Sequence, residues 1–180
     1  MPLNFSTGFG NPEFDCEGRI NIAEYFKFIY LNIYFPNGQK DDERLSYKLR
    51  FYDRCLEIME EKRSLGKIIL VGGDFNTAHH PIDLANPKEN EKTSGFLPVE
   101  RAWLDKIEEM GWIDTFRYFD KSPEQYTWWS YRTKARPRNV GWRLDYFWVN
   151  KEGIEHIKKA GIRQDIEGSD HCPVFVELEI

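Results

Sequence analysis

Alternating apolar and polar residues predict a β-hairpin early in the chain. Residues 19–23 alternate, and residues 26–35 are rich in aromatic and β-branched side chains. Both patterns are typical of strands, and the Pro36-Asn37-Gly38 tripeptide that follows is typical of a turn. We therefore expect two antiparallel strands within residues 18–35.

The next apolar positions have helical spacing. Asp41 or Asp42 can cap the start of this helix, and Gly66 ends the pattern. Residues that recur at intervals of four and three lie on one face of an α-helix. Here they are Leu45, Leu49, Tyr52, Leu56 and Met59.

Residues 67–71 form a short, mostly apolar run, which is typical of a strand buried on both faces. This strand leads directly into Gly72-Gly73-Asp74. Residues 76–97 are polar and interrupted by prolines, so we expect an ordered loop there. Pro98 then begins a second helix that ends at Gly111.

Three further strands are expected in the C-terminal half, over residues 126–131, 143–149 and 173–180. Alternating strands and helices, with both hairpins and buried runs, favour a layered α/β sandwich of mixed β-sheets flanked by helices. At 180 residues, we expect a single domain over residues 1–180.

The composition narrows the class of protein. The sequence has no apolar run of about 18 residues and no secretory signal pattern. Cys16, Cys55 and Cys172 are odd in number and far apart, which argues against a disulfide framework or a thiolate zinc site. His79 and His80 lack the spacing of zinc ligands, so we expect them to bind no metal. We therefore expect a soluble cytoplasmic protein without a membrane partner.

The formal net charge of −5 does not exclude a nucleic-acid partner, because local potential steers a ligand more than net charge does. Between Arg132 and Arg143 the chain carries five basic residues and no acidic one, beside three tryptophans and a tyrosine. Such a run can neutralise phosphates and stack on bases or sugars. Taken alone, however, a basic run is more often a solvated loop.

Polar groups also gather at expected strand ends, where catalytic side chains are commonly found. Asp74 and Asn76 project to one side if their strand continues past Gly73. A carboxylate able to take a proton from water then lies beside an amide able to bind a phosphoryl oxygen. A strand-ending turn explains this tetrapeptide equally well.

His171 follows Gly168 and precedes Pro173, at a second expected strand end. A lone histidine is more often structural, but this one can donate to phosphate or act as an acid or base near neutral pH. If Asp145 reaches its far ring nitrogen, the carboxylate fixes the tautomer and favours imidazolium. We treat that contact as a hypothesis.

Together these segments resemble the exonuclease III and apurinic/apyrimidinic (AP) endonuclease family, within the endonuclease/exonuclease/phosphatase superfamily. The resemblance covers nearly the whole chain, although any one segment alone is a weak pattern. The matching segments are residues 13–19, 32–37, 73–76, 82–88, 94–96, 126–129, 139–147 and 169–173.

The resemblance implies a DNA-repair phosphodiesterase that cleaves 5′ to an abasic deoxyribose in duplex DNA, often with 3′-to-5′ exonuclease activity. It implies Mg²⁺ or Mn²⁺ as the cofactor. By position, Asp74 orients or deprotonates the attacking water, and Asn76 and His171 stabilise phosphoryl charge. Asp145 holds His171, and Asp170 with Asp74 is the candidate metal ligand.

The remaining matching residues are expected to contact the substrate. The family contacts the scissile phosphate and the backbone, binds the flipped abasic sugar in an apolar pocket, and inserts a side chain into the duplex in some members. By position, Tyr34, which we count as catalytic, and Asn37 contact the scissile phosphate, and Asn90 contacts the backbone. The sugar pocket consists of Trp128, Trp142 and Leu144. Arg132 occupies the position of the inserted side chain.

One departure from the family pattern concerns the N-terminus. The resemblance implies a further segment before Met1, supplying an Asn and the Glu that is the principal metal ligand. Glu13, Glu17 and Glu24 fall in a later hairpin and do not replace that Glu. We therefore expect a fold lacking its N-terminal part, with an unpaired apolar edge that self-associates or accepts a complementing N-terminal chain.

Two alternatives stay open. The chain is a non-catalytic module that binds abasic or nicked DNA, or it belongs to another branch of the superfamily, acting on inositol phosphates or RNA. Residues 139–145 favour the abasic-DNA branch.

Overall fold

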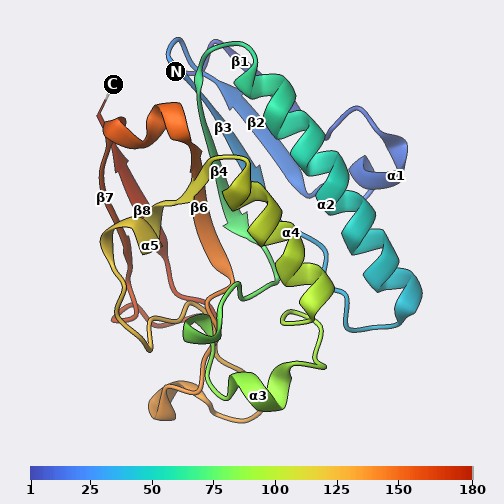
Figure 1. Ribbon diagram of the computed structural model, residues 1–180, viewed down its shortest axis with the longest axis vertical. Helices are drawn as coiled ribbons and strands as arrows, with labels where there is room; N and C mark the ends of the chain where they lie inside the picture. Colours follow the sequence, from blue (N-terminus) through green and yellow to red (C-terminus); the bar gives the residue numbers. More distant parts are fainter. Residues whose placement is uncertain (180) are drawn as a thin grey trace.

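The computed structural model describes residues 1–179. A six-stranded mixed sheet has two long helices against one face and a two-stranded sheet beside the other (Figure 1). The strand order in the large sheet is β1-β2-β3-β4-β6-β5, with β3 and β4 parallel and the other pairs antiparallel. The layered, mixed α/β fold predicted from the sequence is confirmed.

The predicted hairpin is present as β2 (Ile20–Glu24) and β3 (Phe28–Ile33). The apolar run after the first long helix forms β4 (Ile68–Asp74), whose first five residues are buried, and the chain returns beside it as β6 (Asp145–Asn150). Patterning did not indicate the two outer strands, β1 (Asn4–Thr7) and β5 (Trp112–Asp114), because both are short.

The two long helices are α2 (Asp42–Arg63) and α4 (Pro98–Glu109), which lie side by side (Figure 1). Asp41 caps α2, since its side chain accepts the backbone N–H of Arg44 at 2.8 Å. The buried face of α2 differs from the predicted one at its start. Leu45 and Leu49 are only partly buried, whereas Lys48 is fully buried.

Short helices occupy the connections. They are α1 (Pro12–Asp15), α3 (Pro87–Asn90), α5 (Thr115–Phe119) and the 3₁₀ turns at Pro81–Asp83, Arg136–Arg138 and Lys151–His156. The loop predicted over residues 76–97 is therefore ordered. None of the helices within residues 1–179 is both long and apolar enough to cross a membrane.

The second sheet consists of β7 (Ile157–Ile162) and β8 (Val174–Leu178) and packs on Ile68, Leu70 and Val149 of the large sheet. The last strand is thus confirmed, although Ile180, its predicted end, lies outside the described residues. Among residues 1–179, β8 pairs only with β7, and its apolar side chains are half-buried. Within these residues one edge of β8 therefore has no strand partner, and a segment that pairs with it stays a prediction.

The strand predicted over residues 126–131 is wrong. Only isolated bridges form there, from Trp128 to Trp142 and to His171. The N–H groups of Thr127 and Trp128 both donate to the carbonyl of Trp142, while that of Trp129 donates to Asp170. Because the backbone divides its hydrogen bonds between two segments, no continuous ladder develops.

A buried ion cluster ties the loop after β4 to β5 and β6. The Nε of Arg143 donates to Oδ1 of Asp83 at 2.8 Å, and Nη1 lies 2.7 Å from Oδ2 of Asp114. The Nη2 of Arg117 donates to the same oxygen of Asp83 at 2.7 Å. Burial opposes the charge of Asp83, but the two guanidinium groups hold its pKa well below the usual range.

We predict that Asp83→Asn lowers the free energy of unfolding by about 3–5 kcal/mol at neutral pH, because the buried guanidinium groups of Arg143 and Arg117 lose the carboxylate charge that they share. Urea unfolding measures this change. Asp165→Asn is the control, since that carboxylate pairs with Arg163 at the surface and should matter little.

The same pair of proteins gives a pH test. A carboxylate with a depressed folded-state pKa stabilises above its unfolded pKa and loses that contribution as pH falls through the folded value. The difference between wild type and Asp83→Asn should therefore shrink as pH falls below about 4. A difference that stays constant in acid would contradict this account of the cluster.

Candidate active site

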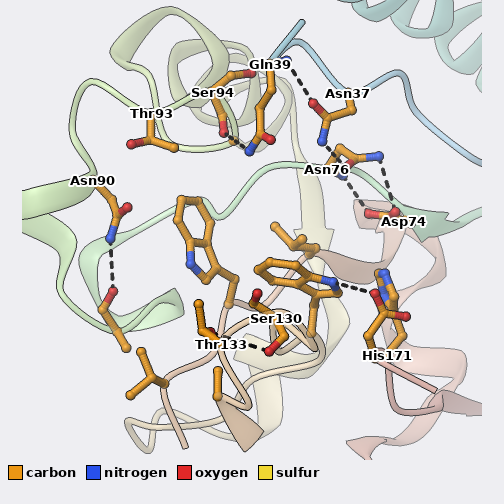
Figure 2. A pocket seen from close by; sticks show the side chains of 18 of the residues that line it. Asn37, Gln39, Asp74, Asn76, Asn90, Thr93, Ser94, Ser130, Thr133 and His171 are labelled. Atoms are coloured by element: carbon orange, nitrogen blue, oxygen red, sulfur yellow. Dashed lines mark hydrogen bonds between the residues drawn. The ribbon is translucent and has the colours of Figure 1, made fainter. Parts of the chain in front are cut away.

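Most of the predicted site residues line one cavity of about 520 Å³ at an end of the large sheet (Figure 2). Asp145 lies behind His171, and Arg132 is exposed between the lining residues Ser130 and Thr133. The predicted residues in the lining are Tyr34, Asn37, Asp74, Asn76, Asn90, Trp128, Trp142, Leu144, Asp170 and His171.

The floor of the cavity is set by strand pairing. β4 ends at Asp74, directly opposite Asp145 at the start of β6. Gly73 has φ +135°, and a Cβ there would lie 2.1 Å from the carbonyl oxygen of Ile33. Glycine alone permits this close approach of β3, so the backbone holds Asp74 at a fixed position.

Asp74, Asn76 and Asn37 form one hydrogen-bonded chain (Figure 2). The backbone N–H of Asn76 donates to Oδ1 of Asp74 at 2.8 Å, and its Nδ2 lies 3.2 Å from Oδ2. Asn37 donates to Oδ1 of Asn76 at 3.1 Å. The two side chains meet as predicted, but through a turn: the strand ends at Asp74, and Asn76 has φ +51°.

His171 is held by Asp145, as we hypothesised. Its Nδ1 lies 2.8 Å from Oδ2 of Asp145, which leaves Nε2 as the other polar atom of the ring. Burial disfavours the imidazolium, but the hydrogen bond and charge of Asp145 prevail and raise the pKa of His171. The pairing with Asp145 therefore favours the protonated ring, in which Nε2 is a donor.

For Asp74 the surroundings favour the neutral form of the side chain, whereas for His171 they favour the charged form. Burial, followed by the charge of Asp145, raises the pKa of Asp74 to about 7. A carboxyl group with a pKa near neutrality is suited to accept a proton from water. Two carboxylates at one strand end also make the site receptive to a cation.

An apolar wall adjoins these polar groups. Leu144 is 8% exposed and packs with Phe96 and Leu84, against which Trp128 and Trp142 are partly buried. The indole N–H of Trp128 donates to Oδ2 of the half-buried Asp170 at 3.0 Å. The cavity therefore joins a phosphate-sized polar end to an apolar recess.

The outer rim contains the remaining candidates. Tyr34 is 53% exposed and stacks beneath Arg19, whose Cζ lies 4.7 Å from the ring centre. Asn90 lies across the cavity from Asn76, with its Nδ2 donating to the carbonyl of Asn86 at 2.8 Å (Figure 2). Both positions are accessible to a ligand that enters the cavity.

The basic run is mostly used inside the fold, which limits its predicted role as a DNA surface. Arg143 belongs to the buried ion cluster, and Arg138 donates to the carbonyl of Thr133 at 3.0 Å. Arg136 donates to the carbonyls of Ser169, Gln164 and Ile166. Arg132 and Lys134 are exposed on the same loop.

His79 and His80 lie outside the cavity lining. The Nε2 of His79 lies 2.8 Å from Oδ1 of Asp105, and the two imidazole rings stack with their centres 3.7 Å apart. One ligand atom from each of His79, His80 and Asp105 lies within 4.8 Å of the others, which is close enough for a metal ion. That these histidines bind no metal stays a prediction.

Sequence reasoning assigned no role to several lining residues. Gln39 follows the predicted turn and donates to the carbonyl of Ser94, and the polar residues Thr93, Ser130 and Thr133 complete the rim. Gln39 could have been found as the next polar residue after Asn37. The others lie in loops whose path the sequence pattern does not specify.

The sequence model of the endonuclease/exonuclease/phosphatase family matches residues 2–171. The chain belongs to this family. It is 40% identical over 180 residues to an exodeoxyribonuclease of Bacillus subtilis, covering 99% of this chain and 71% of that protein. The resemblance to the exonuclease III and AP endonuclease family is thereby confirmed.

Two other family relatives show the extent of the match. Recombination repair protein 1 of Drosophila melanogaster is 39% identical, with 100% of this chain covering 26% of that protein. The structure of an AP endonuclease from Archaeoglobus fulgidus superimposes with a TM-score of 0.88 at 26% identity, covering 100% of this chain and 72% of that one. The family chain described here thus spans only part of each relative.

We predict that Asp145→Asn lowers the pKa of His171, because the substitution removes the carboxylate that favours imidazolium. Titration of the imidazole ¹⁵N resonances in metal-free buffer measures this shift. The wild-type midpoint should lie above the ordinary value of about 6.5. His156, which is remote from the cavity, shows whether the substitution disturbs the rest of the protein. An unchanged His171 midpoint would contradict the pairing.

Proposed function

We propose that this chain carries the catalytic machinery of an exodeoxyribonuclease III-type phosphodiesterase, which cleaves duplex DNA 5′ to an abasic site. The observation that carries the proposal is the meeting of Asp74, Asn76 and the Asp145–His171 pair at one cavity. The names of the relatives, an exodeoxyribonuclease and an AP endonuclease among them, support the substrate class.

The chemistry follows from the position of each group. Asp74 accepts a proton from water as the water oxygen attacks phosphorus. The bond from phosphorus to the 3′-oxygen breaks, and the leaving oxygen takes a proton from solvent. The products are a 3′-hydroxyl on one side and a phosphate on the abasic sugar. The imidazolium of His171 and the amide of Asn76 stabilise the negative charge that develops on the phosphoryl oxygens.

Hydrogen bonds within the protein fix the orientation of the Asn76 side-chain amide. One hydrogen of Nδ2 is directed at the carbonyl of Phe35, 2.8 Å away, which fixes the side chain. The other donates to Oδ2 of Asp74 over a longer distance, 3.2 Å, and turns to a phosphoryl oxygen only when that bond is given up. Asn37 holds the amide oxygen, so the donating end points toward the cavity.

A divalent cation, Mg²⁺ or Mn²⁺, fits the donor set. Asp74 and the half-buried Asp170 present carboxylate oxygens to the cavity. Burial, followed by the charge of Asp145, raises the pKa of Asp74, and a cation beside it would offset both effects. These two residues would hold the ion, which supplies charge neutralisation at the phosphoryl group when bound.

The apolar recess of Trp128, Trp142 and Leu144 suits an extruded abasic sugar. Extrusion costs least where no base has to be unstacked, and a small recess excludes nucleotides that retain a base. Tyr34, Asn37 and Asn90 contact the phosphates on either side, and the exposed Arg132 contacts or wedges the duplex. These residues are the same ones that the sequence predicted to contact the substrate.

The chain acts as one partial domain, residues 1–180, and requires a further polypeptide segment for full activity. It spans 26% of the Drosophila protein and 71% of the Bacillus protein. Among residues 1–179, one edge of β8 has no strand partner, so an added strand can pair with it. Either a complementing N-terminal chain or a second copy supplies that strand. The three free cysteines support a reducing, cytoplasmic location.

We predict that the protein, alone or with a complementing segment, cleaves a duplex with one tetrahydrofuran abasic analogue when Mg²⁺ or Mn²⁺ is added. Asp74→Asn and His171→Ala should each lower the rate at least about 100-fold, because each removes a group that acts in the transition state. Gel analysis of a labelled strand measures both the rate and the cleavage position. Cleavage by Asp74→Asn at the wild-type rate would exclude this mechanism.

The alternative, a DNA-binding module without catalysis, is favoured by the same cavity and is separated by the same assay. Binding of the abasic duplex with no cleavage under any complementation would support it. Preference for an inositol phosphate or for RNA over abasic DNA would instead place the chain in another branch of the family.

We also predict that Arg132→Ala weakens DNA binding several-fold with little change in the rate of the bound complex, because it removes one phosphate-binding charge. Fluorescence anisotropy at two salt concentrations measures the affinity and its salt dependence. Arg50→Ala, on α2 and outside the cavity, removes the same charge and serves as the control. Equal effects of the two substitutions would contradict a specific role for Arg132.

A further inference from the structure

Lys48 of α2 is a fully buried cation that reaches the backbone of the site. Its ammonium group donates to the carbonyl of Asn76 at 2.8 Å, to Oγ1 of Thr77 at 2.8 Å and to Oε1 of Glu100 at 2.6 Å. The side chains of Lys48 and Glu100 are both 0% exposed. All three donors of the ammonium are therefore used within the protein.

Glu100, on α4, extends the connection to a second segment of the cavity lining. Its Oε1 also accepts the hydroxyl of Ser94 at 2.9 Å, and its Oε2 accepts the backbone N–H groups of Gly95 at 2.6 Å and Leu97 at 3.0 Å. Ser94 and Gly95 line the cavity beside Asn76, and the N–H of Ala78 donates to the carbonyl of Gly95 at 2.8 Å. One ion pair thus connects two adjacent segments of the lining.

The Asn76 end of this connection needs external support. Its φ of +51° lies in the left-handed region, which costs a residue with a side chain about 1 kcal/mol or more. Tyr52, one helical turn beyond Lys48, holds the same segment through Oγ1 of Thr77 at 2.7 Å and the carbonyl of Phe75 at 3.1 Å. α2 therefore fixes the backbone on both sides of Asn76.

Stability alone does not explain a buried ion pair here. Removing two charges from water costs several kcal/mol per ion, and apolar residues of similar volume often replace such pairs without loss of stability. The pair does, however, satisfy five polar groups, three of them on the lining residues Asn76, Ser94 and Gly95, which apolar residues cannot do. The role of the ion pair is therefore to hold these polar groups in position.

We propose that Lys48 and Glu100 are positioning residues, which act through Asn76 and the Ser94–Gly95 segment to set the geometry of the phosphate end of the cavity. Neither touches the substrate. This inference rests on the proposed function, because the group being positioned is the phosphoryl-binding amide of Asn76. The Lys48–Glu100 pair holds the backbone that carries this amide and keeps the Ser94–Gly95 segment in place beside it.

The test removes both charges together, so that neither is left buried alone. Lys48→Met/Glu100→Gln is compared with Lys62→Met/Glu24→Gln, which removes an ion pair of the same composition on the same helix, remote from the cavity. Thermal unfolding of both double variants shows whether they remain folded. The abasic duplex assay gives kcat and KM for each.

We expect Lys48→Met/Glu100→Gln to lower kcat at least about tenfold with little change in KM, since Asn76 acts on charge that develops in the transition state. The Lys62/Glu24 control should retain the wild-type kcat. In an Asn76→Ala background, the Lys48/Glu100 substitutions should cause less than about a twofold further loss, because their effect passes through Asn76. An undiminished loss in that background would overturn the inference.

A second readout does not depend on catalysis. The side-chain amide ¹⁵N–¹H resonances of Asn76 should shift and exchange faster with solvent in Lys48→Met/Glu100→Gln, and should stay unchanged in the control. If wild type never cleaves but this change occurs, the proposed function fails and the positioning role stands. Unchanged Asn76 resonances would overturn the positioning role whatever the activity.

Discussion

The pairing of β4 with β6 is the constraint on which the site depends. Its register places Asp74 opposite Asp145 at the point where both strands meet the cavity. Two carboxylates at such close quarters repel each other, and the surrounding protein weakens their hydration. A shift of one residue in either strand would turn the carboxylate of that strand to the other face of the sheet, away from its partner, so the site cannot exist without this alignment.

The neighbouring groups can be understood as responses to that placement. His171 binds Asp145, whose carboxylate favours the protonated imidazole. Asn76 donates two hydrogen bonds to Asp74, one from its backbone N–H and one from its side-chain amide. Lys48 adds a buried cation behind the same segment. The fold thus holds Asp74 and Asp145 close together, and the neighbouring groups neutralise their negative charge only in part. The remaining negative charge favours the binding of a cation or of a water that donates a proton.

Local patterns predicted the elements that have strong periodicity and failed where tertiary contacts decide the backbone path. The hairpin, α2, α4 and β4 follow directly from alternation, helical spacing and apolar runs. Residues 126–131 have the composition of a strand, yet their N–H groups serve two different segments. Asp74, Asn76 and His171 were identified because family motifs fix their order, whereas spacing alone left each of them ambiguous.

Lys48 shows most clearly what sequence reasoning missed. It lies four residues before Tyr52 and seven before Cys55, on the stripe that the structure buries, but a lysine on a helix is normally assigned to solvent. The apolar stripe chosen from the pattern, through Leu45 and Leu49, is displaced from the buried one by part of a turn. A charged residue at an otherwise apolar helical position was the available signal.

Arg136, in the middle of the basic run, binds other parts of the protein. Arg136 crosses the face of Trp129 at 4.6 Å and donates to three carbonyls in the segment leading to Asp170 and His171. A guanidinium committed to carbonyl oxygens and an indole face is held by the fold and is poorly placed to meet a phosphate. Its contribution to the site is therefore mechanical: it fixes the loop that delivers His171 to Asp145. Counting basic residues along the chain overstates the DNA-facing charge, because the same chemistry that recognises phosphate also ties loops together.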